Sequence, residues 1–363
     1  MEQWERRREA LRRTLGESEA DGFLVTSPTN VRYLTGFTGD STVLVFGRDR
    51  ETLVSDGRFT TQLEQECPGL AVNIRPSGTE LVRAMADLVE SLGWRSLAFE
   101  AGCTVAERDA MAGLLAGTGL IAVRGWVEKL RSVKDELEIA AIREMTRCAE
   151  RAFTMVRAGL RPDDTEKDVA DAMETALRRC GATVSSFPTI VAVGARAALP
   201  HARPTRTTRI RDDDFVLIDW GASGEPYKSD LTRVVATGKV TSKFETIYRT
   251  VLAAQERAIA AIRPGATGHE IDAEARSVIE EAGFGAFFDH GVGHGIGMDI
   301  HEAPRIRRDS KDVLEPGNVI TVEPGIYLPD WGGVRIEDDV LVTQAGCEVL
   351  SRVPRSLDSL RLD

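Results

Sequence analysis

Three of the chain's five histidines, His290, His294 and His301, lie within one stretch of twelve residues. Glycines alternate with them in the segment H-G-V-G-H-G-I-G-M-D-I-H-E, which ends at Glu302. Histidine is the commonest nitrogen ligand for metals and is easily tuned for proton transfer near neutral pH, whereas glycine lets the backbone approach a ligand closely. The segment has few apolar side chains, so core packing explains it poorly. It predicts a metal-binding or acid–base site, and a mobile glycine loop with incidental histidines is the alternative.

Two aspartates flank a predicted turn earlier in the chain. Asp219 lies in the apolar run 215–220, and Asp230 lies just before the run 231–233, with glycines and a proline between them. This turn chemistry predicts a hairpin, which would bring the two aspartates side by side across two strands. Either aspartate alone could instead cap a strand end or bind water.

Two glutamates belong to later β runs. Glu323 follows the apolar run 319–322, and the segment V-R-I-E places Arg335 and Glu337 two residues apart. Side chains two apart on a strand point to the same face, so Arg335 and Glu337 are expected to share one. A glutamate on a strand, taken alone, could equally be a solvated surface residue.

Gathered in one pocket beside His294, these four carboxylates could not all stay ionised without compensation. Two divalent cations would cancel their charge formally. Oxygen-rich ligation with one imidazole and no thiolate suits Mn²⁺, Co²⁺ or Zn²⁺ better than soft ions. Two such ions can share a water, lower its pKa and polarise a carbonyl, so the pattern indicates metal-assisted hydrolysis.

The elements before residue 126 alternate between strands and helices, which predicts an α/β domain. No histidine precedes position 201, and this part of the chain shows no catalytic constellation. Periodicity predicts helices over 3–15, 79–92 and 105–115, and strands over 22–27, 42–46, 51–55, 97–100 and 121–125.

The pattern changes after residue 126, where a long helix with one apolar stripe is predicted over 135–158. A second helix, 165–179, begins at a plausible Thr165 cap. The remainder is rich in β signals and predicts an α+β domain with strands over 189–193, 215–220, 233–236, 319–322 and 334–342, and helices over 242–262 and 269–282. We therefore expect domains over residues 1–126 and 134–363, joined by a linker over 127–133.

Composition limits the function classes further. The net charge of −11 argues against a nucleic-acid partner. No apolar run is long enough to span a bilayer, the N-terminus has no secretory h-region, and its basic residues are interleaved with glutamates, as in a solvated helix. The five cysteines form no C-x-x-C pair, which indicates reduced thiols. We expect a cytoplasmic protein without membrane or nucleic-acid contacts.

Five segments together resemble the pita-bread metallopeptidases, the family of methionine aminopeptidase, prolidase and Xaa-Pro aminopeptidase. They are L-P-H-A-R-P-T around His201, I-D-W-G-A and Y-K-S-D-L-T-R within 218–233, the histidine stretch 290–302, T-V-E-P-G at 321–325 and V-R-I-E-D at 334–338. The mild departure is Trp220, where relatives more often have a smaller apolar residue. The resemblance implies an α/β N-terminal domain followed by an α+β pita-bread catalytic domain.

The resemblance also implies a role for each site residue. Asp219 would bind one metal, Asp230 and Glu337 would bridge both, and His294 with Glu323 would complete the second. By the same resemblance Glu323 accepts a proton from the bridging water, and His201 and His301 face the substrate as catalytic groups. His290 and Arg335 correspond to outer, substrate-binding members, and His269 matches no site position.

The N-terminal segments N-V-R-Y-L-T-G-F-T at 30–38 and S-D-G-R-F-T-T-Q at 55–62 resemble those of Xaa-Pro peptidases. Together with the ligand set, the resemblance implies an enzyme with two divalent ions, Mn²⁺ first, that cleaves peptides with proline in second position through a metal-bridged water. We also expect a homo-oligomer, namely a dimer. Segments 30–38 and 199–205 favour an Xaa-Pro aminopeptidase, with an Xaa-Pro dipeptidase (prolidase) as the alternative. A metal-free creatinase-type C–N hydrolase and a non-catalytic binding module are disfavoured by the intact ligand set.

Overall fold

The computed structural model describes residues 2–224 and 226–362. The chain divides into two compact units, Met1–Arg131 and Ser132–Asp363, each of which is described by itself. Within the described residues, no helix combines the length and the apolar character needed to cross a membrane.

Unit 1 is built on a six-stranded sheet in the order β4-β3-β2-β1-β5-β6. The pairs β1–β5, β5–β6 and β3–β4 are parallel, whereas β2 runs antiparallel to β1 and β3. The strands are β1 (Gly22–Val25), β2 (Val43–Gly47), β3 (Glu51–Asp56), β4 (Ala71–Arg75), β5 (Ser96–Glu100) and β6 (Gly119–Val123).

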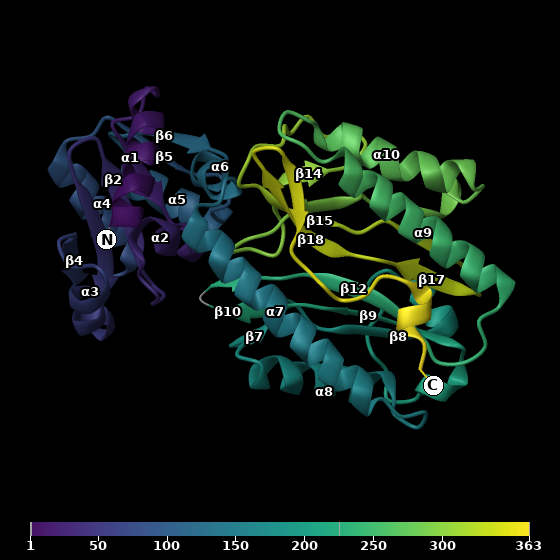
Figure 1. Cartoon of the computed structure of the whole chain (residues 1–363). Coiled ribbons are helices and arrows are strands. Elements are labelled where there is room, and N and C mark those ends of the chain that lie inside the picture. The colour runs from purple at the N-terminus through teal and green to yellow at the C-terminus, as the bar shows by residue number, and fades with distance from the viewer. Residues whose placement is uncertain (1, 225, 363) are drawn as a thin grey trace. The chain divides into compact units, whose positions relative to one another are not determined.

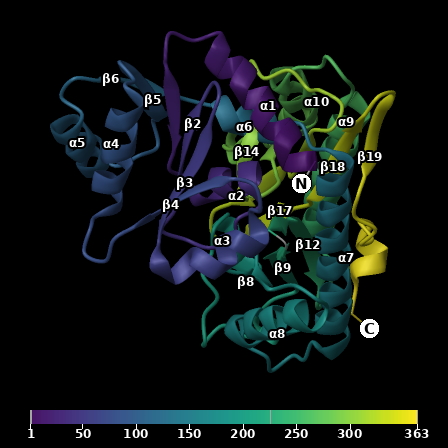
Figure 2. The same ribbon diagram turned by 90° about the vertical axis from the view of Figure 1, so that its left-hand side faces the viewer.

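Helices cover both faces of this sheet (Figure 2). They are α1 (Glu2–Gly16), α2 (Pro28–Thr35), α3 (Thr60–Glu66), α4 (Leu81–Leu92), α5 (Val105–Leu114) and α6 (Trp126–Ser132). Met85 and Val89 of α4 and Met111 of α5 pack with the sheet residues Leu24 and Leu97 in one apolar core. The short elements α2, α3 and β4 were not expected from the sequence, and α6 occupies most of the segment expected to be a linker.

Four long helices shape unit 2 (Figure 1). They are α7 (Glu136–Gly159), α8 (Glu166–Arg179), α9 (Ser242–Ala261) and α10 (Gly268–Glu281). Asp135, Thr165 and Thr267 begin α7, α8 and α10 with reciprocal capping boxes, which satisfy backbone N–H groups that a helix start leaves open. The predicted boundaries of these helices agree with the structure to within one or two residues.

The strands of unit 2 form several small sheets. The first half supplies β7 (Val184–Ser185), β8 (Ile190–Val193), β9 (Phe215–Trp220), β10 (Ala222–Gly224), β11 (Tyr227–Lys228) and β12 (Leu231–Ala236), with orders β12-β9-β8 and β11-β10-β7. The second half supplies the sheet β14-β13-β15-β18-β19 and the hairpin β16–β17. These strands are β13 (Gly293–Gly295), β14 (Glu302–Ile306), β15 (Val319–Val322), β16 (Gly325–Leu328), β17 (Gly332–Arg335), β18 (Asp338–Thr343) and β19 (Gly346–Val349).

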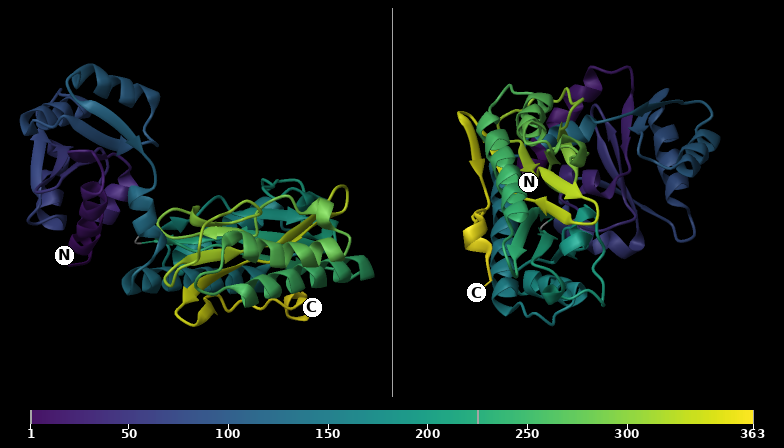
Figure 3. Two further views of the ribbon diagram at one scale, coloured as in Figure 1. Left: turned by 90° about the horizontal axis from the view of Figure 1, so that it is seen from above. Right: turned by 90° about the vertical axis from the view of Figure 1, so that its right-hand side faces the viewer.

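Two apolar clusters hold the sheets of unit 2 against its helices. One joins β8, β9 and β12 to α7 and α8, and the other joins the second half's strands to α9 and α10. Helices α7 and α9 lie on the same side of the strands (Figure 3). The long helices therefore cover one side of the strands.

Two local expectations were wrong. The single strand expected over 334–342 is divided, because β17 pairs with β16 while β18 pairs with β15 and β19. The hairpin of β9 and β12 forms, yet its register pairs Asp219 with Thr232, so Asp230 lies one step beyond the ladder, diagonal to Asp219. The shift follows from β10 and β11, which extend the connection as a small ladder of their own.

Candidate metal centre

A cavity of about 820 Å³ in unit 2 brings the predicted site residues together. Its lining contains all nine of them: His201, Asp219, Asp230, His290, His294, His301, Glu323, Arg335 and Glu337. They come from the loop between β8 and β9, β9 itself, the residue before β12, β13 with the loops on either side of it, the loop after β15, the end of β17 and the segment between β17 and β18. His269 lies elsewhere, exposed in the first turn of α10, where its Nδ1 is 2.6 Å from the carbonyl oxygen of Arg308.

Strand β9 places Asp219 by alternation. Trp220, the next residue, points to the opposite face, where its ring stacks on Phe153 of α7 with centroids 4.5 Å apart. The Trp220 indole N–H also donates to the carbonyl oxygen of Ala149 at 3.0 Å. The bulky residue at this position therefore anchors the strand to α7 and leaves the face that carries Asp219 open to the cavity.

Glycines place His294 by letting strands approach closely. A Cβ added at Gly293 would lie 2.0 Å from the carbonyl oxygen of Thr321, and one added at Gly295 would lie 2.1 Å from that of Ala303. Both distances are far below any van der Waals contact, so only glycine fits on either side of His294. We expected these glycines to bring the backbone close to a ligand; instead they bring it close to neighbouring strands.

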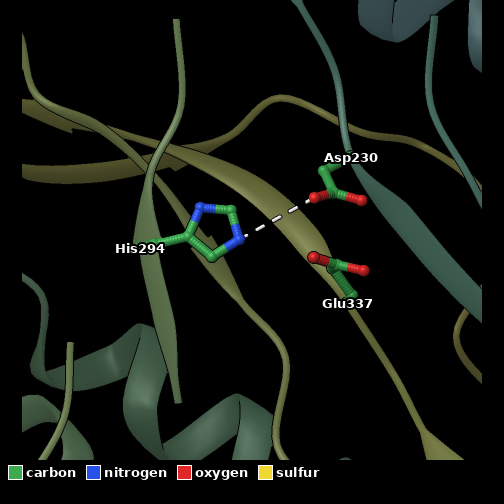
Figure 4. A group of neighbouring side chains, drawn as sticks. All are labelled: Asp230, His294 and Glu337. Carbon is green, nitrogen blue, oxygen red and sulfur yellow. Dashed lines mark ion pairs between the residues drawn. The ribbon is translucent and has the colours of Figure 1, made fainter. Parts of the chain in front are cut away.

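The imidazole of His294 faces carboxylates on one side and backbone on the other. Its Nδ1 lies 3.0 Å from the carbonyl oxygen of Gly295, which can only accept, so Nδ1 carries a proton, and Nε2, which faces the carboxylates, is the nitrogen that would bind a metal once deprotonated. Nε2 lies 3.3 Å from Glu323 Oε1 and 3.8 Å from Asp230 Oδ2. Asp230, His294 and Glu337 each offer a ligand atom within 4.8 Å of the other two and point toward one another (Figure 4).

The carboxylates of this cluster are short of hydrogen-bond partners. Asp219 Oδ1 and Glu337 Oε1 are buried and, among the described residues, have no hydrogen bond. Burial raises the pKa of Asp219, Asp230 and Glu337, and for Asp230 and Glu337 the neighbouring carboxylates raise it further. Buried carboxylates with orphaned oxygens beside a free imidazole nitrogen fit divalent cations, which would supply the missing partners and charge.

Glu323 behaves differently from the other carboxylates. Burial raises its pKa, but the hydrogen bond and charge of His294, with His290 and Arg335 nearby, outweigh burial and lower the pKa to about 2. Glu323 therefore stays ionised at any physiological pH.

Arg335 and Tyr327 form a buried layer behind the carboxylates. Arg335 donates to Asp219 Oδ2 at 2.6 Å and to the Tyr327 hydroxyl at 2.9 Å, and His290 Nε2 lies 3.0 Å from the same hydroxyl. Burial raises the pKa of Tyr327 to about 12, so the phenol is protonated. Sequence reasoning missed Tyr327, although period-two alternation from Gly325 would have placed it on the cavity side.

Thr232 of β12 was also not predicted from the sequence. Its hydroxyl contacts both Arg335 and Glu337. The available signal was again alternation, since Asp230 and Thr232 are two residues apart in D-L-T-R. On the solvent side, His201 and His301 are exposed, and the His301 ring meets that of His294 edge-on, with centroids 4.4 Å apart.

Arginines line the cavity farther from the carboxylates. Strand β14 alternates buried and exposed residues, so that Arg305 faces the cavity, and Arg307 and Arg203 line it as well. Arg307 is paired with Asp309 at 3.0 Å, whereas within the described residues no ion pair holds the Arg305 or Arg203 guanidinium. The cavity thus combines a cluster of acids with cations that are free to meet an anionic group.

Two family models match the chain. That of metallopeptidase family M24 matches residues 140–344, and that of the creatinase/prolidase N-terminal domain matches residues 7–133. The chain is similar to a solved Xaa-Pro dipeptidase from Bacillus anthracis, with a TM-score of 0.94 and 38% identity over 99% of this chain and 100% of that one. It is 33% identical over 344 residues to the Xaa-Pro dipeptidase of Pyrococcus horikoshii, covering 94% of this chain and 96% of that protein. A solved X-Pro aminopeptidase from Thermotoga maritima matches with a TM-score of 0.86 and 34% identity, over 95% and 99% of the two chains.

Proposed function

The chain belongs to metallopeptidase family M24, and from that premise we propose that it is a metal-dependent Xaa-Pro dipeptidase. The observation that carries the proposal is the cluster of Asp219, Asp230, Glu323 and Glu337 around the free Nε2 of His294. Its orphaned buried oxygens need cations, and the cavity around it is large enough for a dipeptide.

We assign the ligands as the resemblance implies. Asp219 would hold one divalent ion, His294 and Glu323 the other, and Asp230 and Glu337 both. When bound, such a pair of ions supplies an activated water and polarises the scissile carbonyl. Mn²⁺ is the first candidate for these oxygen-rich ligands, and Co²⁺ and Zn²⁺ are also compatible.

The chain's own groups handle protons and orientation. Glu323, ionised because of its low pKa, is placed to accept a proton beside His294. Partial desolvation of its ring and the neighbouring His294 lower the pKa of His301, so this imidazole is mainly neutral at pH 7 and would donate a hydrogen bond to the substrate rather than a charge. Arg335, itself held by Tyr327, restrains Asp219 from behind, and His201 lies on the solvent side of the cavity, where it can contact the substrate.

Two observations favour a dipeptidase over the aminopeptidase that segments 30–38 and 199–205 suggested. Relatives named Xaa-Pro dipeptidases match nearly the whole chain, by sequence and by structure. The cavity also presents arginines without ion pairs, which suit the free carboxylate that directly follows proline in a dipeptide. Aminopeptidase activity remains the second candidate because of the similarity to the Thermotoga maritima enzyme.

Metal analysis and a dipeptide assay test the proposal together. We expect the purified protein, loaded with Mn²⁺, to hold two ions per chain and to release proline from Xaa-Pro dipeptides. The isosteric variant Asp230→Asn should lose at least one ion, and hydrolysis should fall by several orders of magnitude while the fold persists. A wild-type protein that binds no divalent ion, or an Asp230→Asn variant with two ions and full activity, would refute the assignment.

A further inference from the structure

Thr232 lies between two carboxylates of the cluster, those of Asp219 and Glu337. It lies in β12, fully buried, and pairs with Asp219 across the ladder to β9. On its other side it forms an isolated antiparallel bridge with Glu337, whose backbone N–H donates to the Thr232 carbonyl oxygen at 3.2 Å. The backbone therefore fixes Thr232 between the residues proposed to bind metal.

The Thr232 hydroxyl makes two hydrogen bonds whose direction is determined. Oγ1 lies 3.1 Å from Nε of Arg335 and 2.6 Å from Oε2 of Glu337. A guanidinium can only donate, so Oγ1 accepts from Arg335, and it donates its single proton to Glu337 when that carboxylate is ionised, the form that would bind metal. Oε2 of Glu337 is thereby committed as an acceptor, and Oε1 is the oxygen left without a hydrogen bond.

Arg335 restrains one oxygen of Asp219 in the same way that Thr232 restrains one oxygen of Glu337. Its Nη2 donates to Asp219 Oδ2 at 2.6 Å, which leaves Oδ1 as a buried oxygen without a partner among the described residues. Thr232 and Tyr327 hold the guanidinium through Nε and Nη1, so its orientation toward Asp219 depends on both contacts. In each carboxylate one oxygen is consequently left without a hydrogen bond, while the other is restrained by the Thr232–Arg335 pair.

We propose that Thr232 is a positioning residue that orients Glu337 directly, and Asp219 through Arg335, for binding of the divalent ions. The inference rests on the proposed function, since it requires that these carboxylates bind metal. It does not make Thr232 a ligand or a catalytic group, because its hydroxyl is already used by two protein partners.

A buried threonine in a strand has a simpler explanation, which is packing. Threonine and valine have nearly the same shape, whereas serine keeps the hydroxyl and loses the methyl group. A packing role predicts that Thr232→Val is tolerated and Thr232→Ser is harmful. A positioning role predicts the reverse for metal binding, because the hydroxyl and not the methyl group makes the contacts.

The test is a Mn²⁺ titration of metal-stripped wild type, Thr232→Val and Thr232→Ser by calorimetry, with thermal unfolding of each metal-free protein beside it. Loss of such an outer contact typically weakens metal affinity about 10- to 100-fold, which we expect for Thr232→Val, and Thr232→Ser should stay within about threefold of wild type. The activity of the loaded enzyme is not needed for this readout.

Each outcome separates the hypotheses. Equal Mn²⁺ affinity in wild type and a folded Thr232→Val would overturn the positioning role, and so would a loss in Thr232→Ser as large as that in Thr232→Val. If Thr232→Val does not fold, Thr232→Ser decides alone, because a large loss of affinity there contradicts the proposal and retention supports it. A wild type that binds no Mn²⁺ counts instead against the proposed function.

Discussion

Glu323 and Glu337 line the same cavity, but their neighbours drive their pKa values in opposite directions. Burial acts on both, yet Glu323 meets the imidazole of His294, whereas Glu337 faces further carboxylates, Glu323 and Asp219. Two carboxylates whose pKa values are shifted in opposite directions commonly take different roles in catalysis. The low pKa keeps Glu323 ionised, the state in which a carboxylate can accept a proton, and the raised pKa marks Glu337 as a group that needs a cation to ionise.

His301 is expected to act on the substrate and not on the metals. Its ring contacts that of His294 from the solvent side, where His301 is exposed. We expect His301→Ala to retain both ions and to lose about 10²- to 10⁴-fold in kcat, the usual loss for a proton-transfer or hydrogen-bonding group.

Elemental analysis and steady-state kinetics check the His301 prediction. His294→Ala is the comparison that should lose metal, and His269→Ala, at an exposed helix start, is the control that should change neither quantity. Metal loss in His301→Ala equal to that in His294→Ala would show that the two roles are wrongly assigned.

The metal-free protein should become less stable as pH rises. Asp230 and Glu337 have raised pKa values, and burial raises the pKa of Asp339, behind Asp230, to about 7. An acid with a raised folded-state pKa contributes stability that is complete below its unfolded pKa, about 4, and is lost as pH rises through the folded pKa. For Asp339 alone the loss between pH 5 and 7 is about 2 kcal/mol.

Urea unfolding at pH 5 and pH 8, with and without Mn²⁺, measures this effect. Bound cations compensate the ionised carboxylates of the cluster, so the stabilisation by Mn²⁺ should be larger at pH 8. Asp339→Asn, which cannot ionise, should lose part of the pH dependence of the metal-free protein. A metal-free protein that is equally stable at both pH values would contradict the expectation.

All nine predicted site residues line one cavity. Their residue types and their order in the chain were enough to identify them without knowledge of the geometry. Thr232 and Tyr327 were not predicted, because neither residue type by itself indicates a catalytic or metal-binding role. Their importance comes from contacts between strands far apart in sequence, such as the 2.6 Å bond from Thr232 to Glu337. Such contacts depend on register, and register between distant strands cannot be read from one sequence.

At the scale of elements, the capped helices were the most predictable parts. The caps Asp135 and Thr165 and the apolar stripe of α7 are local signals. They depend only on residues close together in the sequence, so they can be recognised before the fold is known. The division between β17 and β18 was not predictable, because an apolar alternating run looks the same whether it serves one sheet or two. The short helices α2, α3 and α6 carry too few residues for a periodic pattern.

Gly293 should be irreplaceable for reasons of space. Its added Cβ would meet the Thr321 carbonyl at 2.0 Å, and backbone of the paired strand cannot move aside without opening the ladder beside His294. We expect Gly293→Ala to cost roughly 3 kcal/mol or more in unfolding free energy, the upper part of the range for overpacking. Metal affinity should fall with it, because His294 moves with its strand.

Gly113→Ala is the matched control for this substitution. Gly113 lies in α5 with nothing within 4 Å of an added Cβ, so alanine there should stabilise by about 0.5–1 kcal/mol. Urea unfolding of both variants gives the comparison. A Gly293→Ala variant as stable as wild type would show that β13 can shift away from β15 at little cost.

For the whole molecule, the site belongs to one unit. Every residue of the proposed metal centre lies in Ser132–Asp363, and unit 1 matches a separate family model. The expected homodimer stays a prediction, to be measured by light scattering of the purified protein. Within unit 2, the choice between dipeptidase and aminopeptidase depends on what the arginines of the cavity recognise.

We expect the enzyme to prefer an Xaa-Pro dipeptide over the matching Xaa-Pro amide, which has nearly the same size but no carboxylate. Arg305 projects from β14 into the cavity beside His301, and no ion pair within the described residues occupies its guanidinium. A bidentate arginine–carboxylate contact is among the stronger polar interactions. A preference of about tenfold or more in kcat/KM, or ~1.4 kcal/mol in transition-state binding, is therefore expected.

Arg305→Gln should reduce that preference by raising KM for the dipeptide while leaving the amide nearly unchanged. Arg307→Gln is the control, because Arg307 already pairs with Asp309 and is not expected to bind the substrate. If wild type instead cleaves the amide and an Xaa-Pro-Xaa tripeptide at least as well as the dipeptide, the open side of the cavity accommodates a continuing chain. The protein would then act as an Xaa-Pro aminopeptidase, and the cavity arginines would serve another purpose than carboxylate recognition.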